Sequence, residues 1–239
     1  MGALHHFNIR HLAPKHGCRR FIETGTAHGH GLDYARRQNR FDRLDSIECH
    51  APTAGLARER FAAYPHVHIH HGDSPAVLRD LLALAAAEPV FFWLDAHFPG
   101  ADIGAAGFDA EPDPAKRWPL QGELDAIAAV PDIARPAVIL IDDLRIYTGQ
   151  GWDYQRCRLA PAPDLSLPLA EGPNIPLSPS FPGDTPGDRP ALDLTAFAST
   201  HHAEVWHWHE GYVLLLPNAG GMARELAAQD SDNTNQLNG

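Results

Sequence analysis

The stretch that decides the fold is Arg19–Gly31, which reads R-R-F-I-E-T-G-T-A-H-G-H-G. An apolar run ends there on Glu23, and a loop with Gly25 and Gly29 follows directly. In parallel α/β sheets, a strand, a glycine-rich loop and a helix start form a unit that binds nucleotide-like cofactors. Glycine allows the loop to turn tightly and its backbone to approach a ligand closely. The stretch therefore predicts a nucleotide-like cofactor at the carboxyl end of this strand.

The order of the glycines bears on which cofactor this is. The dinucleotide fingerprint G-x-G-x-x-G has glycine at its first, third and sixth positions. Here the order is Glu23, Gly25, Gly29 and Gly31, which fits that fingerprint poorly. Glu48, however, also suits the ribose of a dinucleotide. A nicotinamide cofactor therefore stays open as an alternative.

Short strand-like segments alternate with helix-like segments along most of the chain. This alternation predicts a parallel sheet covered by helices. We expect parallel strands at 20–24, 43–48, 67–71, 90–94 and 137–141, and helices at 32–40, 51–64, 75–87 and 120–129. Two further runs, 203–209 and 212–216, predict a terminal hairpin with its turn at Glu210 and Gly211. The predicted fold class is α/β, with a doubly wound, mostly parallel, seven-stranded Rossmann-like sheet and a C-terminal antiparallel hairpin.

The length of 239 residues suits one α/β domain with insertions. We expect a single domain over 1–217, with insertions at 98–119 and 149–190, and a polar, flexible tail over 218–239. Long loops at the binding edge of such a sheet are commonly lids or substrate loops. For the proline-rich segment 149–190, a surface excursion is an equal alternative.

The composition excludes several classes of partner. Nineteen basic residues against thirty acidic ones give a net charge of −11, and no Lys/Arg-rich run occurs. This disfavours nucleic acid and anionic membranes as partners. No apolar run approaches the roughly 20 residues of a membrane span, and no signal-peptide stretch is present, so we expect a cytoplasmic protein. Its expected partner is a small molecule, and a homo-oligomer is possible.

Acidic residues end the predicted parallel strands or follow them closely. They are Glu23, Glu48, Asp73, Asp95, Asp142 and Asp143. Since the carboxyl ends of parallel strands lie at one edge of a sheet, these side chains should gather there. Buried carboxylates are costly unless they are paired, hydrogen-bonded or bound to metal. The row therefore indicates a ligand that requires carboxylates.

An ordered set of motifs across residues 19–147 resembles that of class I S-adenosylmethionine-dependent methyltransferases. The motifs are E-T-G at 23–25 with Gly29, S-I-E ending at Glu48, H-G-D-S at 71–74, F-W-L-D-A-H at 92–97 and I-L-I-D-D at 139–143. The resemblance implies that S-adenosylmethionine is the cofactor. It implies that the methionine part contacts Glu23 and the loop of Gly25, Thr26, His28 and Gly29.

The same resemblance implies which residues bind the ribose and adenine parts of the cofactor. Glu48 would accept hydrogen bonds from both ribose hydroxyls, for which a carboxylate is the required acceptor. Asp73 and Ser74 would lie near the adenine, and Asp95 would also border the cofactor. For Asp73, a helix cap ahead of Pro75 is the alternative.

The last two motifs resemble, more narrowly, the metal-dependent O-methyltransferases of the catechol and macrocin types. That resemblance implies that Asp95, Asp142 and Asp143 hold Mg²⁺ or another divalent cation. Such an ion lowers the pKa of a substrate hydroxyl. Asp95 or His97 would then be the catalytic proton acceptor. For the Asp142-Asp143 pair, capping or pairing with a nearby Arg is the alternative.

Two positions depart from the catechol enzymes. Phe98 stands where they carry a lysine, and Asp143 stands where they often carry Asn. Six aromatic residues near the binding edge could line an acceptor pocket or belong to the core: Trp93, Phe98, Trp118, Tyr147, Trp152 and Tyr154.

Three functions are therefore in competition. The leading one is an S-adenosylmethionine-dependent, metal-assisted O-methyltransferase that acts on a small hydroxylated molecule, such as a sugar, an aromatic compound or a natural product. The second is an NAD(P)-dependent oxidoreductase, although no Tyr-x-x-x-Lys pair is evident. The third is a non-catalytic cofactor-binding module whose loops dock a partner.

Overall fold

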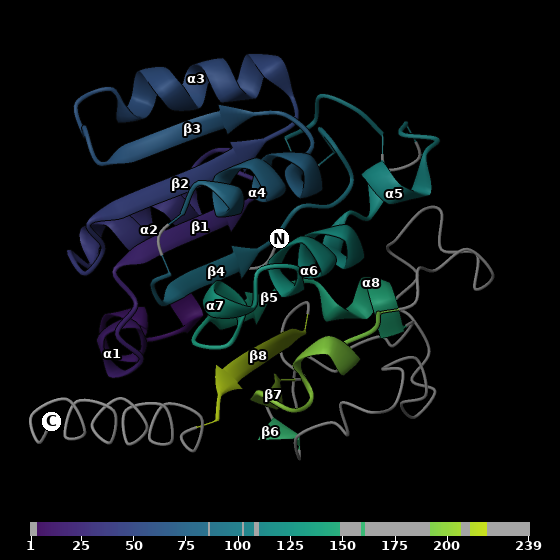
Figure 1. Cartoon of the computed structure of the whole chain (residues 1–239). Helices are drawn as coiled ribbons and strands as arrows, with labels where there is room; N and C mark the ends of the chain where they lie inside the picture. The colour runs from purple at the N-terminus through teal and green to yellow at the C-terminus, as the bar shows by residue number, and fades with distance from the viewer. Residues whose placement is uncertain are drawn as a thin grey trace, which may run out of the picture.

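A single mixed sheet forms the centre of the molecule (Figure 1), seen here in a computed structural model. The structure describes residues 4–85, 87–101, 103–107, 110–148, 159–160, 192–206 and 211–218. The strand order is β3-β2-β1-β4-β5-β8-β7-β6. The first five strands run parallel: β1 (Arg20–Thr24), β2 (Arg43–Glu48), β3 (Val67–His71), β4 (Val90–Leu94) and β5 (Val138–Ile141). The last three are antiparallel: β6 (Leu159–Ala160), β7 (His201–Trp206) and β8 (Tyr212–Pro217).

The predicted α/β class and strand directions are confirmed. All seven predicted strands are present, and β7 pairs with β8 as a hairpin in which Trp206 lies opposite Tyr212. Residues 207–210, which hold the end of the predicted strand 203–209 and the first turn residue, Glu210, lie outside the described residues. The eighth strand, β6, has two residues and pairs with β7. It falls inside the segment 149–190, whose sequence has no strand period that would have predicted it.

The four predicted helices are present with shorter bounds. They are α2 (His30–Arg37), α3 (Ala51–Phe61), α4 (Ser74–Ala83) and α6 (Leu120–Ala128). Short helical segments that we did not predict complete the set: η1 (Leu4–His6), α1 (Ile9–Lys15), α5 (Pro114–Arg117), α7 (Pro131–Ala134), α8 (Leu144–Thr148) and η3 (Thr195–Phe197). Each is too short for a clear helical period. No helix in the described ranges is long and apolar enough to cross a membrane.

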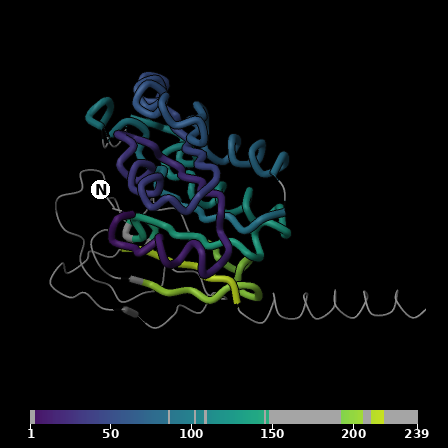
Figure 2. The backbone as a smooth tube through the Cα atoms, turned by 90° about the vertical axis from the view of Figure 1, so that its left-hand side faces the viewer, coloured from purple at the N-terminus to yellow at the C-terminus, as the bar shows by residue number. Residues whose placement is uncertain are grey.

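Two apolar cores lie on opposite faces of the sheet. Strand alternation sends Ile22 to the core on one face and Phe21 to the core on the other. Helices α4 and α6 cover the first face and lie in front of the sheet in Figure 1. The second face is covered by α1 and α2. There the ring of Phe7 packs edge-on against Tyr212, at 5.0 Å between centroids. Figure 2 shows this purple N-terminal segment close to the C-terminal strands.

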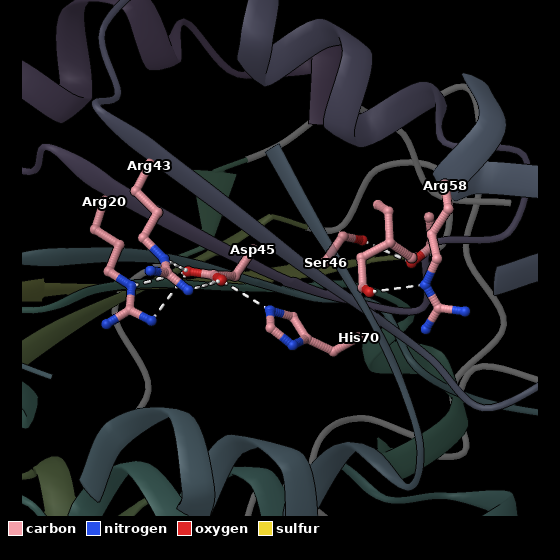
Figure 3. A network of polar contacts seen from close by, with 8 residues as sticks. Arg20, Arg43, Asp45, Ser46, Arg58 and His70 are labelled. Carbon is pink, nitrogen blue, oxygen red and sulfur yellow. Dashed lines mark hydrogen bonds and ion pairs between the residues drawn. The ribbon is translucent and has the colours of Figure 1, made fainter. Parts of the chain in front are cut away.

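One buried carboxylate within the sheet is surrounded by cationic or hydrogen-bonding side chains (Figure 3). Asp45 on β2 is fully buried and accepts hydrogen bonds from Arg20 at 3.0 Å and Arg43 at 2.8 Å. A ring nitrogen of His70 lies 2.8 Å from the other carboxylate oxygen. Burial alone would raise the pKa of Asp45, but His70, Arg43 and Arg20 outweigh it and hold that pKa far below its ordinary value. The charge of this group is therefore balanced within the chain.

Candidate functional site

Four of the six acidic strand-end residues, Glu23, Glu48, Asp73 and Asp95, line one pocket of about 1080 Å³. Its lining includes most of the predicted cofactor and catalytic residues: Glu23, Gly25, Thr26, His28, Glu48, Asp73, Ser74, Asp95 and His97. Gly29, Asp142 and Asp143 are not part of the lining. Ligand pockets commonly measure about 300–1,000 Å³, so this one has room for a cofactor together with a small second molecule.

The glycine loop after β1 is shaped by left-handed backbone positions. Gly25 has φ 79°, Ala27 has φ 44° and Gly29 has φ 72°. A Cβ atom on Gly25 would lie 2.5 Å from the carbonyl oxygen of Asp95, and one on Gly29 would lie 2.8 Å from the ring of Phe61. Any larger residue would clash at both positions. Gly29 therefore supports the loop from behind rather than lining the pocket.

Glu23 is a buried carboxylate beneath the start of α2. The hydroxyl of Ser46 donates a hydrogen bond to it at 2.6 Å, and a Cβ on Gly31 would collide with its carboxylate. Burial raises the pKa of Glu23 to about 8, against the Ser46 hydrogen bond, and the negative charge of Glu48 adds to the rise. A cationic ligand group beside Glu23 would therefore be stabilised.

Glu48 connects the glycine loop to the start of α3. One carboxylate oxygen accepts from the backbone N–H of Ala27 at 2.9 Å, and the other accepts from that of His50 at 2.8 Å. A carboxylate has about four lone-pair positions, so both oxygens can accept further bonds from a ligand. The site suits the paired hydroxyls for which Glu48 was predicted.

Asp73 and Ser74 stand where β3 passes into α4. Asp73 is at the N-cap position, yet its side chain makes no capping hydrogen bond; it is exposed and lines the pocket. The structure therefore does not support the alternative of a side-chain cap. Ser74 is buried, and its hydroxyl donates to the carboxylate of Glu123.

Asp95, His97 and Asp143 come together at the ends of β4 and β5. Each offers one potential ligand atom, and these atoms all lie within 4.8 Å of one another. Nε2 of His97 lies 2.7 Å from a carboxylate oxygen of Asp143, and Nδ1 lies 3.7 Å from one of Asp95. Asp143 has φ 50°, a turn that the sequence does not reveal. We predicted His97 as a base, and the structure adds it to the candidate metal ligands.

Asp142 is not part of that group. It is buried, and within the described ranges neither of its carboxylate oxygens has a hydrogen-bond partner. Burial and the charge of Asp143 raise the pKa of Asp142. Burial and the charge of Asp142 likewise raise the pKa of Asp95, while His97 opposes that rise. Oxygen and imidazole donors with this excess of negative charge fit a divalent cation.

One buried site residue was missing from the sequence prediction. Glu123 on α6 is fully buried and accepts hydrogen bonds from Ser74 and, at 3.3 Å, from Thr24. A signal was present, because Glu123 falls on the apolar stripe of its helix with Leu120, Leu124 and Ile127. A carboxylate on such a stripe requires partners in the interior.

The predicted insertion 98–119 forms one wall of the pocket, through Phe98, Pro99, Gly100, Ile103, Ala105, Ala106, Glu111, Lys116 and Pro119. Of the six aromatic candidates, Trp93 and Phe98 line the pocket. Tyr147 is buried in the core, and Trp118 packs beside Phe98 without lining the pocket. Trp152 and Tyr154 lie outside the described residues.

Comparison with known proteins identifies similar structures but no relative by sequence. No protein-family model matches the chain, and no curated protein matches it. A putative caffeoyl-CoA O-methyltransferase from Staphylococcus aureus is 10% identical, with a TM-score of 0.51 over 91% of this chain and 85% of that one. A methyltransferase from Podospora anserina, solved with S-adenosylhomocysteine, is 14% identical, with a TM-score of 0.49 over 88% of this chain and 76% of that one. The first likeness supports the Rossmann-like methyltransferase fold that the motifs predict.

Proposed function

We propose that this protein is an S-adenosylmethionine-dependent methyltransferase that methylates a hydroxyl group of a small molecule with the help of a divalent cation. The observation that carries the proposal is the shared pocket, which has the glycine loop, Glu23 and Glu48 at one part of its lining and Asp95 with His97 at another. The fold agrees, since its similar structure from Staphylococcus aureus is named as an O-methyltransferase.

The cofactor would supply a methyl group activated by a sulfonium. In our proposal Glu23 and the backbone from Gly25 to His28 bind its methionine part, and Glu48 binds the ribose hydroxyls with its remaining lone pairs. Asp73, whose side chain is exposed to the pocket, binds on the adenine side. These residues hold the donor at the carboxyl ends of β1, β2 and β3, where ligands of open α/β sheets bind.

Asp95, Asp143 and His97 would hold the divalent cation, with Asp142 beside them. When bound, such an ion lowers the pKa of an acceptor hydroxyl and so favours the attacking oxyanion. If His97 is a ligand, the mixed oxygen and nitrogen set suits an ion such as Zn²⁺ better than Mg²⁺. If His97 stays outside the shell, the carboxylates suit Mg²⁺ or Mn²⁺.

His97 is well placed to take the proton of the acceptor hydroxyl. Its Nε2 lies 2.7 Å from a carboxylate oxygen of Asp143, so the negative charge of that carboxylate favours uptake of a proton by the ring. Nδ1 faces Asp95 at 3.7 Å, so a proton taken up there is stabilised by that carboxylate. Asp95 thereby supports the base and remains the alternative proton acceptor.

The wall 98–119 indicates the character of the acceptor. Most of its lining residues are apolar, and Glu111 and Lys116 are the polar exceptions. A molecule with an apolar body and at least one hydroxyl would fit that wall. The cytoplasmic location, the single domain and the absence of a nucleic-acid partner remain predictions from the sequence.

Isothermal titration calorimetry with S-adenosylhomocysteine tests the proposed cofactor. We expect saturable binding by the folded protein, and no quenching or enhancement of NADH fluorescence in a parallel titration. NADH binding without S-adenosylhomocysteine binding would favour the oxidoreductase alternative. If neither molecule binds, the proposed function is wrong.

A further inference from the structure

A buried carboxylate lies directly behind the pocket wall, where it contacts two hydroxyl groups. Glu123 is fully buried and does not line the pocket. One of its carboxylate oxygens accepts from Ser74 and the other accepts from Thr24 at 3.3 Å. Burial raises the pKa of Glu123 to about 7 against these two hydrogen bonds. Burying a carboxylate costs free energy of folding even when it accepts hydrogen bonds, so a role other than stability would account for its position.

The hydrogen bonds of Glu123 lead to two separate parts of the pocket. Ser74 lines the pocket on the predicted adenine side. Thr24 reaches the other part, because its hydroxyl accepts a hydrogen bond from the backbone N–H of Asp95 at 3.2 Å. A hydroxyl has one proton, so Thr24 accepts from Asp95 and donates to Glu123. Glu123 therefore connects the start of α4 to the end of β4.

Close packing holds this connection in place. Helices α4 and α6 approach so closely that a Cβ atom on Gly122 would lie 3.1 Å from the ring of Pro75. Gly122 and Pro75 are the immediate neighbours of Glu123 and Ser74 in the sequence. The short hydrogen bond between Glu123 and Ser74 is thus part of a tight helix contact. A movement of α4 at the adenine side would be transmitted to Glu123.

We propose that Glu123 is a positioning residue that couples the adenine side of the cofactor pocket to the Asp95 end. It acts through Ser74 on one side and through Thr24 on the other, without touching the cofactor. The inference rests on the proposed function, since it takes the pocket to be the S-adenosylmethionine site. Binding at either end would then depend on the same carboxylate.

Affinity for S-adenosylhomocysteine, measured by calorimetry, gives the first test. We expect Glu123→Ala to weaken binding about tenfold, because two hydrogen bonds to a charged group are lost. Glu123→Gln keeps the volume and one acceptor oxygen, and we expect it to recover part of the affinity. Asp125→Asn is the matched control, since Asp125 is exposed on the same helix. Thermal unfolding of each variant separates a loss of affinity from a loss of folded protein.

A double-mutant cycle gives a readout that a purely structural role would not produce. Ser74→Ala and Thr24→Val each leave Glu123 with one hydroxyl partner, and the double variant leaves it with none. We therefore expect the combined loss of affinity to exceed the product of the single losses by about threefold or more. When the same cycle is repeated in the Glu123→Gln variant, the combined loss of affinity should equal the product of the single losses. The cycle remains decisive even if Glu123→Ala does not fold.

Two results would overturn the inference while leaving the proposed function intact. One is wild-type affinity in folded Glu123→Gln and Glu123→Ala. The other is a combined loss for Ser74→Ala and Thr24→Val that equals the product of the single losses. If the wild-type protein itself binds no S-adenosylhomocysteine, the proposed function fails first and the inference fails with it.

Discussion

Two groups of carboxylates in the same sheet differ in their partners. Asp45 on β2 forms the first group by itself, and the strand-end residues Glu23, Asp95, Asp142 and Asp143 form the second. Asp45 is fully buried, and Arg20, Arg43 and His70 surround it (Figure 3). Asp142 is buried to almost the same degree, yet no described residue forms a hydrogen bond with its carboxylate oxygens. The pKa of Asp45 is lowered and that of Asp142 is raised.

The difference shows that burial alone does not determine the ionisation of a carboxylate. The chain supplies the counter-charge for Asp45, so that group stabilises the fold by itself. At the strand ends His97 opposes the rise in the pKa of Asp95 and Asp142, but burial and the negatively charged neighbours outweigh it. A site that is unfavourable for folding and favourable for a cation is what a ligand-binding function requires.

The largest expected effect comes from neutralising a carboxylate of the second group. Asp95→Asn should reduce methyl transfer about a thousandfold, because it removes a candidate cation ligand and the partner of His97. It should not lower stability, since it also removes repulsion with Asp142. Transfer can be followed with labelled S-adenosylmethionine and a panel of hydroxylated acceptors. Substantial residual activity in folded Asp95→Asn would argue against the assignment.

The opposite outcome is expected for the first group. Asp45→Asn should lower the free energy of unfolding by about 3–5 kcal/mol, because the buried guanidinium of Arg20 loses its charged partner. Urea unfolding measures this change. Affinity for S-adenosylhomocysteine, measured where the variant is folded, should stay at the wild-type level. A loss of affinity without a loss of stability would reverse the roles that we assign to the two groups.

The pH dependence of stability should differ between the two groups. The pKa of Glu23 is raised to about 8 in the folded protein. Between the unfolded pKa near 4 and this folded pKa, Glu23 is ionised in the unfolded chain and protonated in the folded one. Over that range it should lower the free energy of unfolding by up to about 1.4 kcal/mol per pH unit. The pKa of Asp45 is lowered, so its contribution is present above about pH 4 and is lost only as the pH falls further.

Urea unfolding at a series of pH values between about 5 and 8 checks this difference. Glu23→Gln should flatten the decline in stability with rising pH, and it should also weaken S-adenosylhomocysteine binding. The exposed Glu59 on α3 provides the matched control, and Glu59→Gln should leave the decline unchanged. An equally steep decline in Glu23→Gln would show that Glu23 is not its source.

The smallest predicted effect concerns the ribose ligand. Glu48→Gln should weaken binding of S-adenosylhomocysteine about tenfold, since an amide replaces a charged acceptor. The hydrogen bonds from Ala27 and His50 need acceptors, so a modest loss of stability should accompany the change. Calorimetry against Glu59→Gln separates the two effects. Unchanged affinity would mean that Glu48 only supports the loop.

Much of the fold could be predicted from the sequence, because strand periods and the Glu23 loop are local signals. The same holds for Glu48, which ends β2, and for Asp95, which directly follows β4. The composition of the metal group could not be predicted. Whether Asp142 or Asp143 faces Asp95 depends on the backbone turn at Asp143, and tertiary contacts set that turn. His97 joins the group through its contact with Asp143, which lies in the turn after β5.

Residues that act across long sequence distances were the hardest to predict. Glu123 is 99 positions from Thr24 and 49 from Ser74, and only folding brings them together. The burial of Asp45 could not be predicted from the sequence either, since an acidic residue in a strand is usually assumed to face solvent. Its partner His70 lies on the neighbouring strand β3, 25 positions away in the sequence. In both cases the partners of a buried carboxylate, rather than the residue itself, determine its role.

The central claim is that the carboxylates at the strand ends take further counter-charge from a bound cation. Calorimetric titration of Mn²⁺ into protein saturated with S-adenosylhomocysteine tests it most directly. We predict one bound ion per chain, abolished by Asp143→Asn and retained in Asp132→Asn, whose side chain is exposed on α7. If folded wild-type protein binds no Mn²⁺, Mg²⁺ or Zn²⁺, or binds the ion equally well after Asp143→Asn, the claim is contradicted.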